Sequence, residues 1–260
     1  MSPVEIVLAL ASGCVIGAVL GLVGGGGSIL AVPLLVYVVG VGSTHVAIGT
    51  AAVAVAANAV AGLVGHARAG TIKWRCAGVF ALTGAVGAAF GAEAGKAFDG
   101  QRLLMLFGLV MIGVGLSMLR KRRSVEMPDV RLTRNSAAAL LPKLVPIGFG
   151  VGLAAGFFGI GGGFLIVPGL IAATAMPLRK AVGTSLVVVT ALGLTTATSY
   201  ALSGYINWTL VALLIAGGVA GAAAGIALGQ RLATRRGLLE RWFASVVILA
   251  GAYVLVRGLS

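Results

Sequence analysis

The sequence predicts an all-α fold, a polytopic transmembrane helical bundle built from two inverted repeats. Of the 260 residues, 59% are hydrophobic and only 10% are charged, with a mean hydropathy of +1.10. Soluble domains carry about 25% charged residues, so this chain is too apolar to cover its core with a polar surface. Apolar stretches of roughly 20 residues, enough to cross a bilayer core as a helix, recur along the chain. The two halves of the sequence also repeat each other.

Eight apolar stretches are expected to cross the membrane as full spans. They are residues 4–23, 46–65, 76–94, 103–119, 143–158, 182–202, 208–229 and 242–258. Two further apolar pieces, 28–40 and 163–176, are too short for a comfortable crossing, and are expected to form short half-helices that either cross or re-enter. Because unpaired backbone groups are not tolerated in lipid, these continuous apolar runs favour helices over strands.

Two glycine-rich stretches carry the internal repeat. They read GLVGGGGSILAVPLL at 21–35 and GFFGIGGGFLIVPGL at 156–170. Further along, Gly49-Thr50 matches Gly183-Thr184, and the glycines at 84, 87, 91 and 95 match those at 218, 221, 225 and 229. We therefore expect a first transmembrane repeat at 1–119, a basic linker at 120–137 and a second repeat at 138–260.

The charges predict that the repeats are inverted. The turn HARAGTIKWR (66–75) is basic and its equivalent, YALSGYINW (200–208), is uncharged, whereas at the next pair of turns the basic member is in the second half, at 230–241. Basic connections stay in the cytoplasm, so equivalent turns face opposite sides, as in many transporters. Five elements in each half, an odd number, satisfy this arrangement. The linker 120–137 is then cytoplasmic and both termini face outward.

The glycine runs predict breaks in helices inside the membrane. Glycine adopts backbone angles that other residues avoid, and Pro33 and Pro168 each remove an N–H from a helix. A half-helix that begins after such a break presents unpaired N–H groups and a positive dipole end, which together bind anions. The alternative for the glycine runs is close helix packing, which is our preferred explanation for the spaced glycines at 84–95 and 218–229.

These patterns give a set of candidate substrate-binding residues: Gly25, Gly26, Gly27, Ser28, Thr50, Asn58, Gly161, Gly162, Gly163, Thr184 and Ser185. The six acidic residues all lie away from the middle of the spans. Intramembrane carboxylates usually mark cation or proton paths, so their absence leaves an anion as the better candidate. For each single hydroxyl, a bond back to its own helix is at least as good an explanation.

No metal or cofactor is expected. Cys14 and Cys76 have no Cys or His neighbour at ligand spacing. The net charge of +13 lies mostly in the connections, so it orients the chain in the bilayer rather than indicating nucleic-acid binding. His45 and His66 could carry a coupling proton, but ordinary interfacial histidines are the favoured interpretation. The expected partners are a small anion, the lipid bilayer and a coupling proton or sodium ion; a homodimer stays open.

The paired motifs resemble the sulfite exporter TauE/SafE family, also called the toluenesulfonate uptake permease family. The resemblance rests on the two glycine-rich stretches followed by HVAIGTA (45–51) and KAVGTSL (180–186), and covers nearly the whole chain. It implies an inner-membrane transporter of small sulfur-containing or organic anions, such as sulfite, sulfoacetate or related sulfonates. The motifs differ where Ser28 faces Gly163 and Gly25 faces Ile160 in the alignment, so the halves are not equivalent at the expected site.

The expected function is secondary transport of such an anion by alternating access, with a passive anion channel as the close alternative. An intramembrane enzyme is disfavoured, because an activated serine needs a base within reach and the two histidines lie near membrane ends. A permease driven by a separate ATPase is a third hypothesis. This chain carries no ATP-binding loop of its own.

Overall fold

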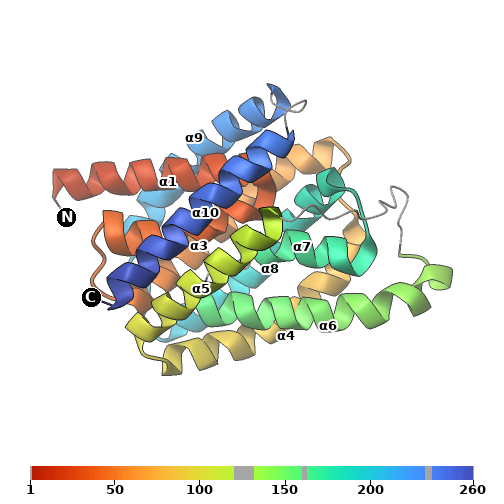
Figure 1. Ribbon diagram of the computed structural model, residues 1–260, viewed down its shortest axis with the longest axis horizontal. Coiled ribbons are helices and arrows are strands. Elements are labelled where there is room, and N and C mark those ends of the chain that lie inside the picture. The colour runs from red at the N-terminus through yellow and green to blue at the C-terminus, as the bar shows by residue number, and fades with distance from the viewer. Residues whose placement is uncertain (1, 120–131, 160–162, 232–235, 260) are drawn as a thin grey trace.

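The computed structural model describes residues 2–119, 132–159, 163–231 and 236–259 (Figure 1). The first half contains α1 (Pro3–Val23), η1 (Gly24–Leu30), α2 (Ala31–Pro33), η2 (Leu34–Val38), α3 (Thr44–Arg68), α4 (Trp74–Ala97) and α5 (Gly100–Leu119). The second half contains α6 (Arg134–Phe158), α7 (Gly163–Thr174), α8 (Leu178–Leu202), α9 (Trp208–Arg231) and α10 (Arg236–Leu259). Every element in these ranges is helical. The last four residues of the expected linker, 134–137, form the first turn of α6.

The membrane spans follow the expected pattern. Among the described residues, seven helices are long and apolar enough to cross a bilayer: α1, α3, α4, α5, α6, α8 and α9. The eighth expected span corresponds to α10, whose apolar part, Trp242–Gly258, is shorter. The segments Gly26–Val38 and Gly163–Thr174 are short apolar helices, where the sequence predicts half-helices. The predicted fold class, a polytopic helical bundle, is confirmed.

The outside of the bundle is apolar. Leu82, Leu249 and Leu109 are 72%, 69% and 56% exposed. In water each such leucine would lose the stabilisation of about 1.5–3 kcal/mol that burial of its side chain provides. Lipid tails, by contrast, are as apolar as the side chain. This surface suits a chain surrounded by a bilayer.

Helices of one half pack closely on helices of the other half. Along the α1–α9 contact the facing residues are Gly13 with Leu214, Gly17 with Gly218, and Gly21 with Ala222. Along the α4–α6 contact they are Phe80 with Gly148, Gly84 with Gly152, and Ala88 with Gly156. In both contacts the residue numbers rise together, so each pair is parallel. The pairs are equivalent, because α1 corresponds to α6 and α9 to α4.

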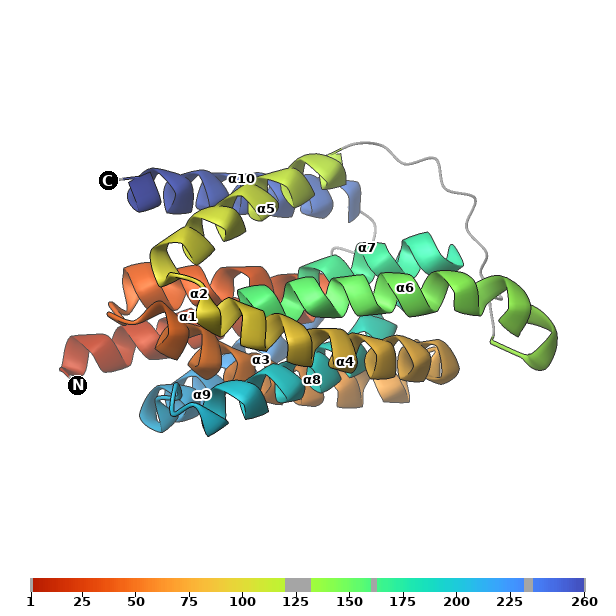
Figure 2. The same cartoon turned by 90° about the horizontal axis from the view of Figure 1, so that it is seen from below.

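The helices α3 and α8 are antiparallel. Gly49, near the start of α3, lies against Tyr200 at the end of α8 and Tyr205 just after it. Gly183, near the start of α8, lies against Thr71 after the end of α3. The helices α5 and α10 are also antiparallel and lie together on one side of the bundle (Figure 2).

These directions establish that the two halves are inverted. The short turns 69–73 and 203–207 make α3–α4 and α8–α9 hairpins, so each helix runs opposite to its equivalent in the other half. Both termini lie at the same end of the bundle (Figures 1 and 2). We call this end, with the turns 39–43, 98–99 and 203–207, the terminal face. The opposite end, with the turn 69–73 and the start of α6, is the linker face.

The spaced glycines are packing residues, as predicted. A Cβ added to Gly17 would collide with the backbone of Gly218, and one added to Gly152 would collide with the backbone of Gly84. The same holds along both helix pairs for the glycines at 87, 91, 95, 221 and 225. Gly229 is outside the residues whose packing is described. Small residues let backbones approach in lipid, where no hydrophobic force holds helices together.

Candidate functional site

At the first glycine run the chain folds back against α1, and its backbone stays helical throughout the reversal. After Val23, residues Gly24–Leu30, which include Gly25, Gly26, Gly27 and Ser28, form a tight 3₁₀ helix. An added Cβ at Gly27 would lie 2.5 Å from the Leu20 nitrogen and 2.8 Å from the Ile16 oxygen. Only glycine lets the returning segment approach α1 this closely.

The second glycine run is a sharper reversal. α6 ends at Phe158, and Gly159 follows with φ = 65°, a left-handed conformation suited to glycine at a helix C-terminus. A Cβ at Gly159 would collide with Ile48 of α3. Two candidate residues, Gly161 and Gly162, lie outside the described residues. α7 begins at the buried Gly163, where the sequence predicts a half-helix to start.

The two prolines take different places in the returning helical segments. Pro168 is inside α7, which continues to Thr174, so this break precedes the proline. There Pro168 removes the N–H that would bond to the Phe164 carbonyl. Pro33 ends α2, and the wider π-helical turn Leu34–Val38 follows it. The proline therefore marks a change of helix type in the first half and sits within one helix in the second.

Both breaks lie inside the bundle. Gly21, just before the first break, packs on Ala222 and Gly225 of α9, which continues to Arg231. Phe157, just before the second break, packs on Gly91 of α4, which continues to Ala97. The returning segments η1 and α7 also contact each other. The described residues that flank the two glycine runs therefore lie inside the bundle, where η1 contacts α7, and the first four N–H groups of α7 have no partner within their own helix.

Thr50 and Thr184 each bind the backbone of the opposite repeat. The Thr50 hydroxyl accepts the Asn207 N–H at 3.0 Å, and the Thr184 hydroxyl accepts the Lys73 N–H at 3.0 Å. Asn207 and Lys73 immediately precede the equivalent helices α9 and α4. Because α3 and α8 are antiparallel, these threonines lie toward opposite faces of the bundle. The structure does not bring them together around one ligand position.

The other polar candidates have different surroundings. The Ser185 hydroxyl donates to the Val182 carbonyl of its own helix at 2.8 Å. Ser28 is fully buried in η1. Asn58 is 1% exposed, and its Nδ2 donates to the Leu214 carbonyl at 3.5 Å. Its Oδ1 is buried and has no hydrogen-bond partner among the described residues.

Replacing Thr50 by valine is expected to destabilise the protein, because the Asn207 N–H then loses its acceptor in a partly buried place. An unpaired buried donor costs about 1–3 kcal/mol. Thermal unfolding in detergent measures the change. The control is Ser185→Ala, which removes only a bond to the residue's own helix and should leave the melting temperature nearly unchanged. Equal melting temperatures for Thr50→Val and wild type would contradict this role.

No cluster of three His, Cys, Asp or Glu side chains that could hold a metal ion occurs in the described part of the chain. The polar groups on the described part of the glycine runs are backbone N–H groups and the buried Ser28 side chain. A neutral, N–H-rich interior of this kind can hold a small anion through hydrogen bonds and helix dipoles.

The chain is similar to known membrane proteins over almost its full length. The model of the family described as sulfite exporter TauE/SafE matches residues 9–254. A probable membrane transporter protein of Xylella fastidiosa (strain Temecula1) is 47% identical over 253 residues, covering 97% of this chain and 96% of the relative. The probable membrane transporter protein YunE of Bacillus subtilis is 26% identical over 270 residues, covering 97% and 98%. No solved structure matches this chain. The resemblance read from the paired glycine motifs is thus confirmed, and the chain belongs to the sulfite exporter TauE/SafE family of multi-pass membrane transporters.

Proposed function

We propose that this protein is a secondary transporter that carries a small sulfur-containing or organic anion, such as sulfite, sulfoacetate or a related sulfonate, across the inner membrane by alternating access. The observation that carries the proposal is the contact between η1, which contains the first glycine run, and α7, which starts at Gly163 after the second. Corresponding interrupted helices in inverted halves are the typical place of a transport site. The family description supports the choice of a sulfur oxyanion.

The charge distribution supports an orientation with the linker face in the cytoplasm. On this face lie Arg68, Lys73, Arg75, Arg179 and Lys180. On the terminal face, the turn between α4 and α5 balances Glu93 and Asp99 against Lys96 and Arg102. By the positive-inside rule, the linker 120–137 is cytoplasmic and both termini are outside.

Two other functions are compatible with a helical bundle. A passive anion channel would use the same N–H groups without coupling to an ion gradient. An enzyme would need a base next to a nucleophile, whereas His45 and His66 lie near opposite ends of α3, in its first and last turns. We therefore propose a coupled transporter, with a proton or a sodium ion as the coupling ion.

Uptake of radiolabelled sulfite, and then of sulfoacetate, into proteoliposomes that contain only this chain tests the proposal. We expect accumulation that depends on an imposed proton or sodium gradient and needs no ATP. Equilibration that ignores every gradient would favour the channel, and no flux of either anion would refute the substrate class.

Gly26→Leu and Gly162→Leu should each abolish uptake in a folded protein. The matched control is Gly78→Leu in α4, where a side chain meets open space.

A further inference from the structure

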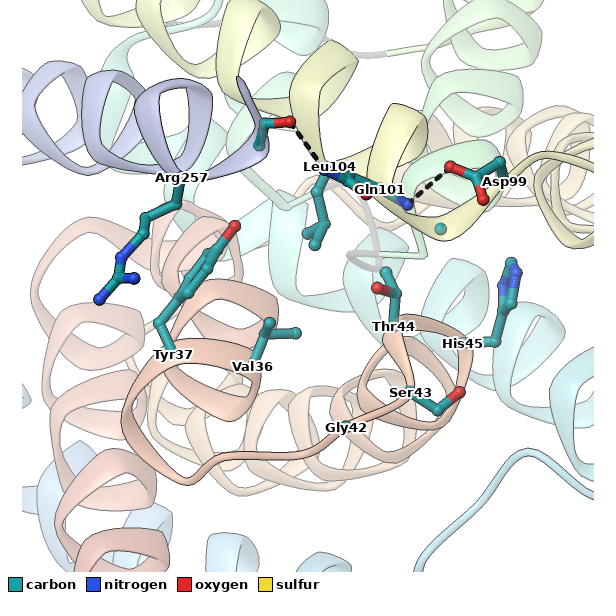
Figure 3. Close-up of a pocket in the computed structure, with 12 residues that line it drawn as sticks. Val36, Tyr37, Gly42, Ser43, Thr44, His45, Asp99, Gln101, Leu104 and Arg257 are labelled. Carbon is teal, nitrogen blue, oxygen red and sulfur yellow. Dashed lines mark hydrogen bonds between the residues drawn. The ribbon is translucent and has the colours of Figure 1, made fainter. Parts of the chain in front are cut away.

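A pocket of about 480 Å³ opens on the terminal face, away from the glycine breaks. It lies between η2, the start of α3, the start of α5 and the end of α10. Figure 3 shows Tyr37 and Arg257 on one side of the pocket and Thr44 and His45 on the other, with Gln101 between them. The Gln101 amide donates to the Gly258 carbonyl at 2.9 Å and ties α5 to α10.

The electrostatics of the pocket favour a negative ligand. The N-terminal end of α3, a helix of 25 residues, borders it, and helix N-termini carry partial positive charge. Arg257 adds a full positive charge. The single carboxylate in the lining, Asp99, accepts the N–H groups of Gln101 and Arg102 at 3.1 and 3.0 Å, so its charge is directed to the start of α5.

Side-chain polar atoms without hydrogen-bond partners occur at the pocket and also deeper in the bundle. The Nδ1 of His45, a half-buried pocket residue, is buried and unpartnered within the described residues. The His45 ring lies 6.4 Å from the ring of Tyr200. The hydroxyls of Tyr200 and Thr196, which are fully buried one turn apart on α8, likewise find no partner in the described ranges. A buried hydroxyl without a partner costs free energy unless a ligand or water meets it.

We propose that this pocket is the loading site through which a small oxyanion enters the transporter from the terminal face, and that His45, Tyr200 and Thr196 donate hydrogen bonds to it as it loses water on its way inward. The inference rests on the proposed function for the direction of travel. The pocket itself is defined independently of it. A sulfonate or sulfite group fits the available volume and can accept hydrogen bonds from several donors at once.

His45 lines the pocket and lies close to the end of α8, in a group of several titratable side chains. The other titratable groups facing His45 are Tyr200 and Tyr205, whose rings lie 6.4 and 5.6 Å away, and Asp99 across the pocket. Behind Tyr200 lies the ion pair of Lys96 with Glu93, at 2.7 Å, which is already neutralised.

Charged thiol reagents test the pocket without requiring transport. In full-length protein with Cys14→Ala and Cys76→Ala, a thiol is introduced by Thr44→Cys in the pocket or, as a matched control, by Leu202→Cys. Leu202 is 86% exposed at the end of α8, outside the pocket lining. Each variant reacts with a methanethiosulfonate that carries either a sulfonate or a trimethylammonium group. The ratio of the two rates cancels differences in thiol reactivity.

We expect the rate ratio at Thr44→Cys to favour the sulfonate reagent about tenfold more than the ratio at Leu202→Cys, since a charged cleft concentrates ions of opposite sign. Sulfoacetate should slow the reaction at Thr44→Cys only. Adding His45→Gln should weaken this protection by sulfoacetate, because it removes a ring nitrogen that has no partner within the described residues. Adding His66→Gln, whose Nδ1 already contacts the Thr71 hydroxyl at 3.0 Å, should not.

Two outcomes separate this inference from the proposed function. Equal ratios at the two positions, or a preference for the cationic reagent at Thr44→Cys, would overturn the loading site even if the proteoliposomes transport sulfite. A clear anion preference in a protein that transports nothing would leave the loading site standing and refute the transporter.

Tyr200→Phe tests the inward path. We expect a tenfold higher KM for anion uptake with an unchanged melting temperature. An unchanged KM would remove Tyr200 and Thr196 from the path.

Discussion

Replacing Gly152 by leucine is expected to prevent the bundle from assembling. A Cβ at this position would collide with the backbone of Gly84, and a backbone cannot move aside as a flexible side chain can. The helices α4 and α6 would have to separate along a contact that continues through Gly87, Gly91 and Gly156. In lipid, this close packing is a main source of helix association, so the loss should exceed the 1–3 kcal/mol typical of overpacking in a core.

A neighbouring glycine provides the control for this prediction. Gly150 lies on the same helix, two residues away, and a side chain there meets nothing within 4 Å. Fluorescence-detected size-exclusion chromatography of detergent extracts should give a monodisperse peak for Gly150→Leu and none for Gly152→Leu. A monodisperse Gly152→Leu protein with a normal melting temperature would show that the two halves are not held together at this contact.

Replacing Asn58 by leucine is expected to abolish anion transport while preserving the fold. The equivalent residue in the second repeat is Leu192, which packs over Gly84 as the Asn58 amide packs over Gly218. The equivalent position of the second repeat therefore already accommodates a leucine. The substitution also removes a buried Oδ1 that has no partner in the described part of the chain, so the free energy of unfolding should stay the same or rise by about 1 kcal/mol.

Separate measurements of stability and transport decide the role of Asn58. We expect the melting temperature of Asn58→Leu to equal or exceed that of the wild type, with sulfite uptake reduced more than tenfold. The reciprocal variant, Leu192→Asn, should lower the melting temperature because it buries an amide in an apolar contact. Wild-type uptake by a stable Asn58→Leu protein would assign Asn58 to packing and remove it from the binding residues.

The sequence predicts the architecture well because membrane folds leave their pattern in short stretches. Apolar length marks the spans, the paired glycine motifs mark the breaks, and the alternation of basic turns marks the inversion. The start of α7 at Gly163 follows directly from the glycine run before it. The packing role of the spaced glycines follows from their helical periodicity, which puts them on one face of α4 and of α9.

Contacts between distant residues could not be predicted in the same way. Thr50 and Thr184 are repeat mates and are therefore reasonable binding candidates. Their actual partners, Asn207 and Lys73, become neighbours only when α3 and α8 pair. The 3₁₀ path of Gly24–Leu30 depends on the approach of Gly27 to α1, which no local signal reveals. The terminal-face pocket combines four segments, and Tyr37, Gln101 and Arg257 have no pattern that links them.

The close contact between α1 and α9 has a consequence for synthesis. The ribosome makes α1 well before α9, so α1 enters the bilayer long before its main partner exists. During that time its glycine face, Gly13, Gly17 and Gly21, is open to lipid or to other proteins. The first half cannot mature on its own, because α4 also waits for α6. Quality control in the membrane must therefore tolerate a nascent chain whose order of translation differs from its order of assembly.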